Sequence, residues 1–108
     1  MTEKDIQNEI RLAVSEYAII FRINTGTFKT ADGRYVSTGV PVGHPDLYGF
    51  RKSDGKLIYI EVKTEKGKLS KEQKHFLEVM SKYPIIAGVA RSASEAVELI
   101  NGSMETTL

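Results

Sequence analysis

The chain has 108 residues, a length that suits one domain with a single hydrophobic core. Hydrophobic residues make up 41% and charged residues 27%, which is the composition of a folded protein, and no apolar run is long enough to span a membrane. The absence of cysteine excludes a disulfide framework, a thiolate metal site and a cysteine nucleophile, and it fits a reducing cytoplasm. The formal net charge of +1 excludes a uniformly basic nucleic-acid binder.

The charge is unevenly distributed along the chain. Residues 51–75 contain eight Lys and Arg but four Asp and Glu, whereas residues 92–108 contain Glu but neither Lys nor Arg. A basic centre with an acidic flank indicates one surface that faces a polyanion. An ordinary solvated face around a hairpin and a helix start would produce the same pattern.

The first half of the chain begins with a predicted helix over residues 3–17, in which apolar side chains recur at helical spacing. They are Ile6, Ile10, Ala13, Val14 and Tyr17. Residues 18–24 are predicted to form a strand. Residues 25–43 are rich in Gly, Thr and Ser, with a turn at 31–33, and are predicted to form a long loop or a loose hairpin.

A β-hairpin is predicted next. Residues 46–52 and 57–64 read as strands, and the intervening Ser-Asp-Gly at 53–55 is a tight-turn signal. The hairpin makes these two strands antiparallel neighbours.

A second helix is predicted to begin after Ser70, because Ser70 and Gln73 have the spacing of a capping box. Pro84 should stop it at about Tyr83. The continuously apolar residues 85–90 then predict a buried strand.

A last helix is predicted to begin at a capping box formed by Ser92 and Glu95 and to end at about Asn101, followed by Gly102. The element order is therefore αβββαβα. An antiparallel meander that feeds a helical crossover into a last strand predicts an α/β fold, with a mixed sheet flanked by helices.

Two charged residues interrupt the apolar strand at 57–64. Glu61 and Lys63 are two positions apart and therefore share one face of the strand. Pro45 stiffens the approach to Asp46, which should lie nearly opposite Glu61 at the far end of the hairpin. Two close carboxylates repel each other unless a proton or a cation intervenes, and oxygen ligands suit Mg²⁺, Mn²⁺ or Ca²⁺. The alternative is a cross-strand ion pair of Lys63 with Asp46 or Glu65 on a solvated face.

This pattern resembles the signature of the PD-(D/E)XK phosphodiesterase superfamily, with Pro45-Asp46 followed by Glu61-Val62-Lys63. The αβββαβ order is also that superfamily's restriction-endonuclease-like core. More specifically, GHPDLYGF…IYIEVKTEKGKLSKEQKHFL resembles the virus-type replication-repair nuclease domain, VRR-NUC. The resemblance covers nearly the whole chain, including Asn-Thr-Gly at 24–26, so we expect residues 1–108 to be one stand-alone nuclease domain.

The resemblance implies a role for each site residue. Asp46, Glu61 and the backbone carbonyl of Val62 would bind a divalent metal, Mg²⁺ or Mn²⁺. Lys63 would position or activate the attacking water. Gln73 would support the site from the second helix. The alternative is that Gln73 has only a structural role, in the capping box with Ser70.

Two further positions bear on the resemblance. Glu9 would reach the site from the first helix as an additional acid, although it could instead pair with Lys4 on a solvated face. Related nucleases often have Tyr four residues after the Gln, where this chain has Leu77. That departure puts any aromatic role at this position in doubt, but it leaves the metal site unaffected.

Contacts to the phosphate backbone of nucleic acid are expected from basic residues that flank the site. The candidates are Lys66, Lys68, Lys71, Lys74 and His44.

The expected function is that of a Mg²⁺- or Mn²⁺-dependent DNA endonuclease in the cytoplasm of a bacterial or phage-infected cell, without a membrane partner. The resemblance implies a structure-specific enzyme that acts on branched DNA such as the four-way Holliday junction. Symmetric incision of a junction requires two active sites, which favours a homodimer. The alternatives are a flap or non-specific nuclease with the same site, and a nucleic-acid-binding module without catalysis.

Overall fold

The computed structural model describes residues 1–23, 27–37 and 39–102. The elements in chain order are α1 (Glu3–Val14), β1 (Ala18–Arg22), β2 (Thr27–Lys29), β3 (Tyr35–Ser37), β4 (Leu47–Arg51), β5 (Leu57–Val62), α2 (Lys71–Met80), β6 (Ile86–Ala90) and α3 (Ala93–Asn101). The predicted α/β fold with a mixed sheet and flanking helices is confirmed. Residues 24–26, which include the end of the first predicted strand, lie outside the described residues.

The main sheet has the strand order β1-β4-β5-β6. β1 pairs with β4 and β4 with β5 in antiparallel fashion, while β6 pairs with β5 in parallel after the α2 crossover. In the β4–β5 hairpin Leu47 lies opposite Ile60, so the next positions outward along the two chains are Asp46 and Glu61. The tight turn at residues 53–55 sets this register because each residue added to the loop would shift the pairing.

Two helices end earlier than predicted. The structure ends α1 at Val14, because residues 15–17 make a tight turn in which the Ser15 and Tyr17 amides donate to carbonyls three residues back. This turn delivers the chain directly into β1. In the same way α2 ends at Met80, and the Tyr83 amide donates to the Met80 carbonyl in a turn that precedes Pro84.

The caps at the start of α2 and at both ends of α3 follow the predicted capping chemistry, with one difference at α3. Ser70 and Gln73 form the predicted capping box, and Gly102 ends α3 in the left-handed conformation with φ of 74°. At α3 the Ser92 hydroxyl accepts from the Glu95 amide, as predicted. The Glu95 carboxylate, however, accepts from the amide of Arg91 and does not close the box on Ser92.

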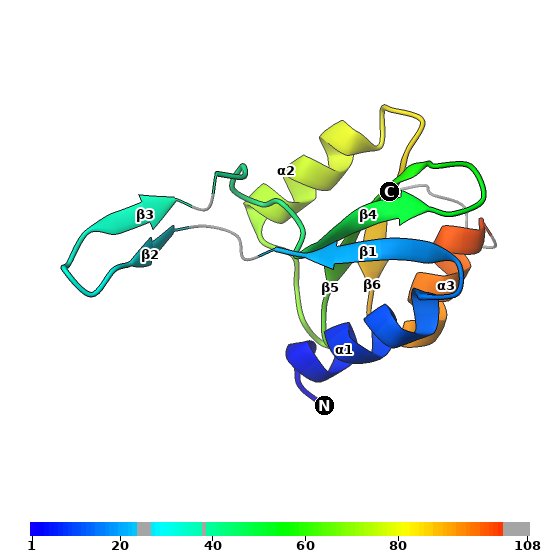
Figure 1. Cartoon of the computed structure of the whole chain (residues 1–108), viewed down its shortest axis with the longest axis horizontal. Coiled ribbons are helices and arrows are strands. Elements are labelled where there is room, and N and C mark those ends of the chain that lie inside the picture. Colours follow the sequence, from blue (N-terminus) through cyan, green and yellow to red (C-terminus); the bar gives the residue numbers. More distant parts are fainter. Residues whose placement is uncertain (24–26, 38, 103–108) are drawn as a thin grey trace.

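The two faces of the sheet are covered unequally. Figure 1 shows α1 and α3 on one side of the sheet and α2 on the other. The α1/α3 side carries the core, whose fully buried members include Ile10, Ile58, Ile60, Val62 and Ile100. Within the described residues, no helix is both long and apolar enough to cross a lipid bilayer.

The segment predicted as a loop or loose hairpin contains a real hairpin. β2 and β3 pair antiparallel over residues 27–37, and we call these residues the arm. Figure 1 shows the arm projecting away from the main sheet, and the chain measures 47 × 30 × 27 Å along its principal axes.

Candidate active site

The candidate site lies on the α2 side of the sheet, at the open end of the β4–β5 hairpin. Glu61 is 3% exposed, although it carries a carboxylate. Its Oε1 accepts a hydrogen bond of 3.0 Å from Gln73 Nε2 and lies 4.0 Å from Lys63 Nζ. Asp46 follows Pro45 into the first position beyond the paired strands, and it is half-buried. The structure therefore brings together Asp46, Glu61, Lys63 and Gln73.

Gly43 allows the loop before β4 to lie against the start of α2. Its φ is 87°, a left-handed value that favours glycine. A Cβ added there would lie 2.3 Å from the carbonyl oxygen of Glu72, so any side chain would collide with the helix backbone. Pro45, two residues after Gly43, is buried. The loop before β4 therefore packs against the first turn of α2, and this contact places Asp46 near the helix that carries Gln73.

His44 packs into an aromatic cluster beneath the site. Its ring lies edge-on to the rings of Tyr48, Tyr59 and Phe76, with centroids 5.9, 5.3 and 5.2 Å away. Nδ1 lies 2.7 Å from the Pro45 carbonyl, which can only accept, so Nδ1 carries the proton. A phosphate contact, which stays a prediction for His44, could therefore use only Nε2.

Gln73 performs both roles that the sequence suggested as alternatives. Its Oε1 accepts from the Ser70 amide at 2.8 Å, closing the capping box of α2. Its Nε2 donates to Glu61 at 3.0 Å. The capping bond fixes which end of the amide is the acceptor, so the NH₂ group is held towards the Glu61 carboxylate.

The pKa of Glu61 is raised to about 7. Burial is the main cause, since it disfavours the charged carboxylate, and the charges of Asp46 and Glu3 raise the pKa further. The ammonium of Lys63 lowers it but does not compensate. A buried carboxylate that is costly to ionise beside a second carboxylate is an environment that a bound cation would relieve.

Few side chains at the site could bind a metal ion. The described part of the chain holds no group of three or more His, Cys, Asp or Glu side chains placed to hold a metal ion. Asp46 and Glu61 therefore stand as the side-chain donors, and backbone carbonyls or water would supply the remaining positions. Mg²⁺ is commonly held in this way, because it keeps several of its waters. The residues present therefore fit Mg²⁺ or Mn²⁺.

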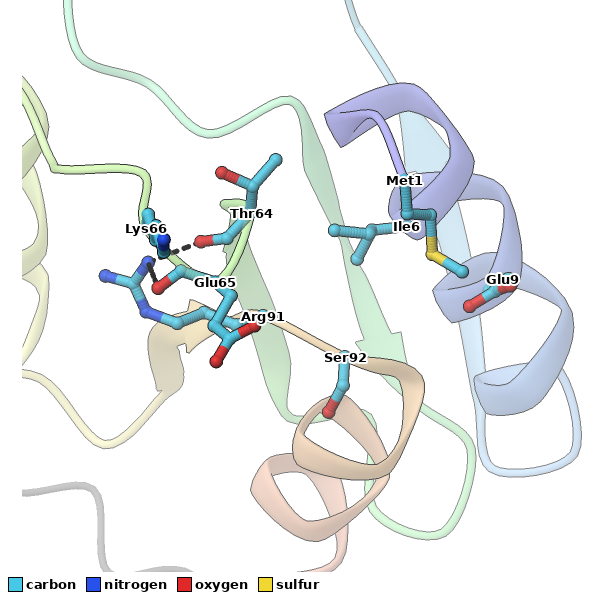
Figure 2. A pocket seen from close by; sticks show the side chains of 8 residues that line it. All are labelled: Met1, Ile6, Glu9, Thr64, Glu65, Lys66, Arg91 and Ser92. Atoms are coloured by element: carbon cyan, nitrogen blue, oxygen red, sulfur yellow. Dashed lines mark hydrogen bonds between the residues drawn. The ribbon is translucent and has the colours of Figure 1, made fainter.

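The first helix brings a different acid towards Glu61 from the one predicted. Glu9 is exposed and lines an open pocket of about 550 Å³. Figure 2 shows it on α1, across this pocket from Thr64 and Arg91. Glu3 is the α1 residue whose charge acts on Glu61. A catalytic role for Glu9 stays a prediction that this arrangement does not support.

The helical periodicity contained a signal for Glu3. The buried residues Gln7, Ile10 and Val14 follow Glu3 at intervals of four, three and four residues, so all four share one stripe of α1. An acid in line with a buried stripe points inwards, whereas Glu9 lies beside it.

The basic residues predicted to contact nucleic acid are exposed around the turn after β5 and the first turns of α2. They are Lys66, Lys68, Lys71 and Lys74. Arg91, which the sequence did not single out, holds this turn in place. Its Nη1 donates to the carbonyls of Thr64 and Gly67 at 2.6 Å each. Figure 2 shows its guanidinium against the turn that follows β5. No motif marks Arg91, because its partners lie 24 to 27 residues away.

Comparison with known families gives one finding. The family model of the VRR-NUC domain matches residues 22–94, which include Asp46, Glu61, Lys63, Gln73 and Arg91. No curated protein matches the sequence. The match covers more than half of the chain, and the fold is the expected restriction-endonuclease-like core. The chain therefore belongs to the VRR-NUC domain family and is a nuclease of the PD-(D/E)XK type.

Proposed function

We propose that this protein is a metal-dependent DNA endonuclease whose active centre is formed by Asp46, Glu61 and Lys63. The observation that carries the proposal is the position of the two carboxylates at the open end of one hairpin, next to a lysine in a strand that is otherwise apolar. Family membership supports the same chemistry.

The two carboxylates would hold Mg²⁺ or Mn²⁺, with the backbone carbonyl of Val62 as a further ligand. When bound, such an ion polarises the phosphoryl group and lowers the pKa of a bound water. Gln73 holds Glu61 by its Nε2 hydrogen bond, so the carboxylate keeps one orientation while substrate binds. This is the positioning on which metal affinity depends.

Lys63 supplies positive charge where negative charge develops. Its Nζ lies 4.0 Å from Glu61 and its side chain is 13% exposed, so the ammonium acts in a largely desolvated site. There it orients the attacking water and stabilises charge on the phosphate. In-line attack by water would leave a 5′-phosphate. The exposed lysines of α2 and the preceding turn would hold the DNA backbone through salt-dependent contacts.

The substrate we propose is branched DNA, such as a four-way junction, cleaved by a homodimer. Symmetric incision needs two active sites related by a two-fold axis. A flap or non-specific nuclease would use the same centre, and a nucleic-acid-binding module would have no use for it.

A cleavage panel tests these proposals. The protein is incubated with a four-way junction, a flap and a linear duplex, with Mg²⁺, with Mn²⁺ and with chelator. We expect cleavage to require metal and to be fastest on the junction. Asp46→Asn should abolish it, whereas Asp54→Asn, at the opposite end of the same hairpin, should not. Metal-dependent cleavage that survives Asp46→Asn would show that the site is wrong.

A further inference from the structure

The α2 side of the sheet carries apolar side chains that stay partly exposed. In β1, Ile19 and Phe21 are 39% and 48% exposed. Phe50 in β4 is 41% exposed and Leu57 in β5 is 38% exposed. The strand register places Ile19, Phe50 and Leu57 in one cross-strand row, and Phe21 lies in the next row beside Tyr48. We call Ile19, Phe21, Phe50 and Leu57 the open face.

The open face continues directly from the candidate active site. From Asp46 along β4, the side chains of Tyr48 and Phe50 point to the same side of the sheet as that of Asp46, because successive side chains alternate. Two residues of a strand span about 7 Å, so Tyr48 lies about 7 Å and Phe50 about 13 Å from Asp46 along the strand. Phe21 packs on Tyr48, with ring centroids 5.6 Å apart. A DNA strand that is bound at Asp46 and runs along β4 would therefore pass Phe21 and then Phe50.

Cations border the open face. Arg22 ends β1, and Lys52 and Lys56 flank the turn of the β4–β5 hairpin. In the described part of the chain none of these three forms a salt bridge, since Asp54, the acid of this turn, is paired with Arg51. An apolar surface bordered by three such cations is complementary to a partner that combines flat apolar rings with negative charge. A strand of nucleic acid has both, in its bases and its phosphates.

The size of the open face fits bases better than a protein surface. A large apolar side chain offers roughly 200 Å², so four of them at these exposed fractions present on the order of 300 Å². A stable protein interface buries about 800 Å² on each partner. Base stacking needs far less area, because a single aromatic side chain can receive a base. Phe21 and Phe50 therefore suffice for two bases.

We propose that the open face binds bases at the branch point of the DNA substrate, which stack on Phe21 and Phe50. The three bordering cations contact the adjoining phosphates. Bases inside a continuous duplex are covered by their neighbours, so this surface selects DNA in which a branch point interrupts the stacking. The inference rests on the proposed function, since it names the DNA feature that the same active site would select.

The spacing along β4 predicts which bases are bound. A stacked strand advances about 3.4 Å per nucleotide. At that spacing Phe21 and Phe50 lie roughly two and four nucleotides from a phosphate held at Asp46. The two stacking positions are therefore about two nucleotides apart.

The first experiment measures DNA affinity by fluorescence anisotropy in chelator, so that binding is observed without cleavage. One probe is a flap DNA with a single-stranded arm. A second probe has abasic residues at the first four positions of that arm and keeps every phosphate. We expect the abasic probe to bind the unaltered chain at least about tenfold more weakly. Single abasic residues, moved one position at a time along the arm, should locate two sensitive positions about two nucleotides apart.

The second experiment changes the protein. Phe21→Ala and Phe50→Ala should each weaken binding of the flap about tenfold and have little effect on the abasic probe, because the stacking is already absent there. Phe50→Tyr should keep the affinity, whereas Phe50→Leu, which keeps an apolar side chain but has no ring, should lose it. Leu12→Ala is the matched control, since Leu12 is 79% exposed on α1, and it should bind both probes as the unaltered chain does. Circular dichroism checks that each variant folds.

Three results would overturn the proposal. They are equal affinity of the unaltered chain for the two probes, normal flap binding by both alanine variants, and flap binding by Phe50→Leu as tight as that of the unaltered chain. Alanine variants that bind DNA normally but change the oligomeric state in sedimentation velocity would assign the open face to a protein partner instead. Base-dependent binding by a chain that cleaves no DNA would refute the proposed nuclease function and leave this surface standing, and cleavage without base-dependent binding would do the reverse.

Discussion

The raised pKa of Glu61 makes a quantitative prediction about stability in the absence of metal. The ordinary value is 4.5 and the folded value is about 7, so the folded state binds this proton more tightly than the unfolded state. Stability contributed by the protonated form is fully present below pH 4.5, and it is lost as the pH rises through 7. A difference of this size corresponds to about 3 kcal/mol, an upper figure because local relaxation and water entry reduce it.

The perturbation that isolates this effect is Glu61→Gln, which keeps the shape of the side chain and removes the titration. In chelator, the unaltered protein should lose up to about 3 kcal/mol of unfolding free energy between pH 4.5 and pH 8 relative to the variant. The comparison uses the pH dependence and not the absolute stability, because the variant also leaves Lys63 without its counter-charge. Groups that do not interact with Glu61 titrate equally in both proteins and cancel.

The assay is urea unfolding followed by circular dichroism at several pH values, with the linear extrapolation that suits a small domain. Glu78→Gln, an exposed substitution on α2, is the control and should follow the unaltered protein at every pH. Mg²⁺ added above pH 7 should stabilise the unaltered protein and have little effect on Glu61→Gln. Identical pH profiles for the unaltered protein and Glu61→Gln would refute the reasoning.

Three further predictions follow from the geometry of the site. Gly43→Ala should cost roughly 2 kcal/mol or more of stability by urea unfolding and reduce cleavage, since it combines left-handed strain with a collision at the α2 backbone; unchanged values would contradict this. Arg91→Met should leave the carbonyls of Thr64 and Gly67, in the turn after β5, without their donor. We therefore expect weaker DNA binding and a single-turnover cleavage rate at least about tenfold lower; values equal to those of the unaltered protein would show that the turn keeps its conformation without Arg91. Glu3→Gln should lower the pKa of Glu61, observed as a shift of the chelator pH profile, whereas Glu9→Gln should not; the reverse result would restore Glu9 to the site.

Much of this protein could be predicted because the deciding signals are local. The turn at residues 53–55 sets the hairpin register, and the register places Asp46 opposite Glu61 whatever the rest of the chain does. Ser70 and Gln73 cap α2 within four residues of each other. For the same reason the order of the main-sheet strands and of the three helices follows from periodicity and turn residues.

Other features depend on how distant elements meet. The resemblance suggested Glu9, whose role stays a prediction, whereas the α1 charge that raises the pKa of Glu61 is that of Glu3. The rotation of the helix against the sheet decides which of its acids faces Glu61. Arg91 stabilises the turn after β5 because the fold places the β6–α3 junction, which carries Arg91, against that turn. Phe50 in β4 and Leu57 in β5 stay partly exposed on the α2 side of the sheet, and side-chain alternation within one strand carries no information about where a helix on that side stops.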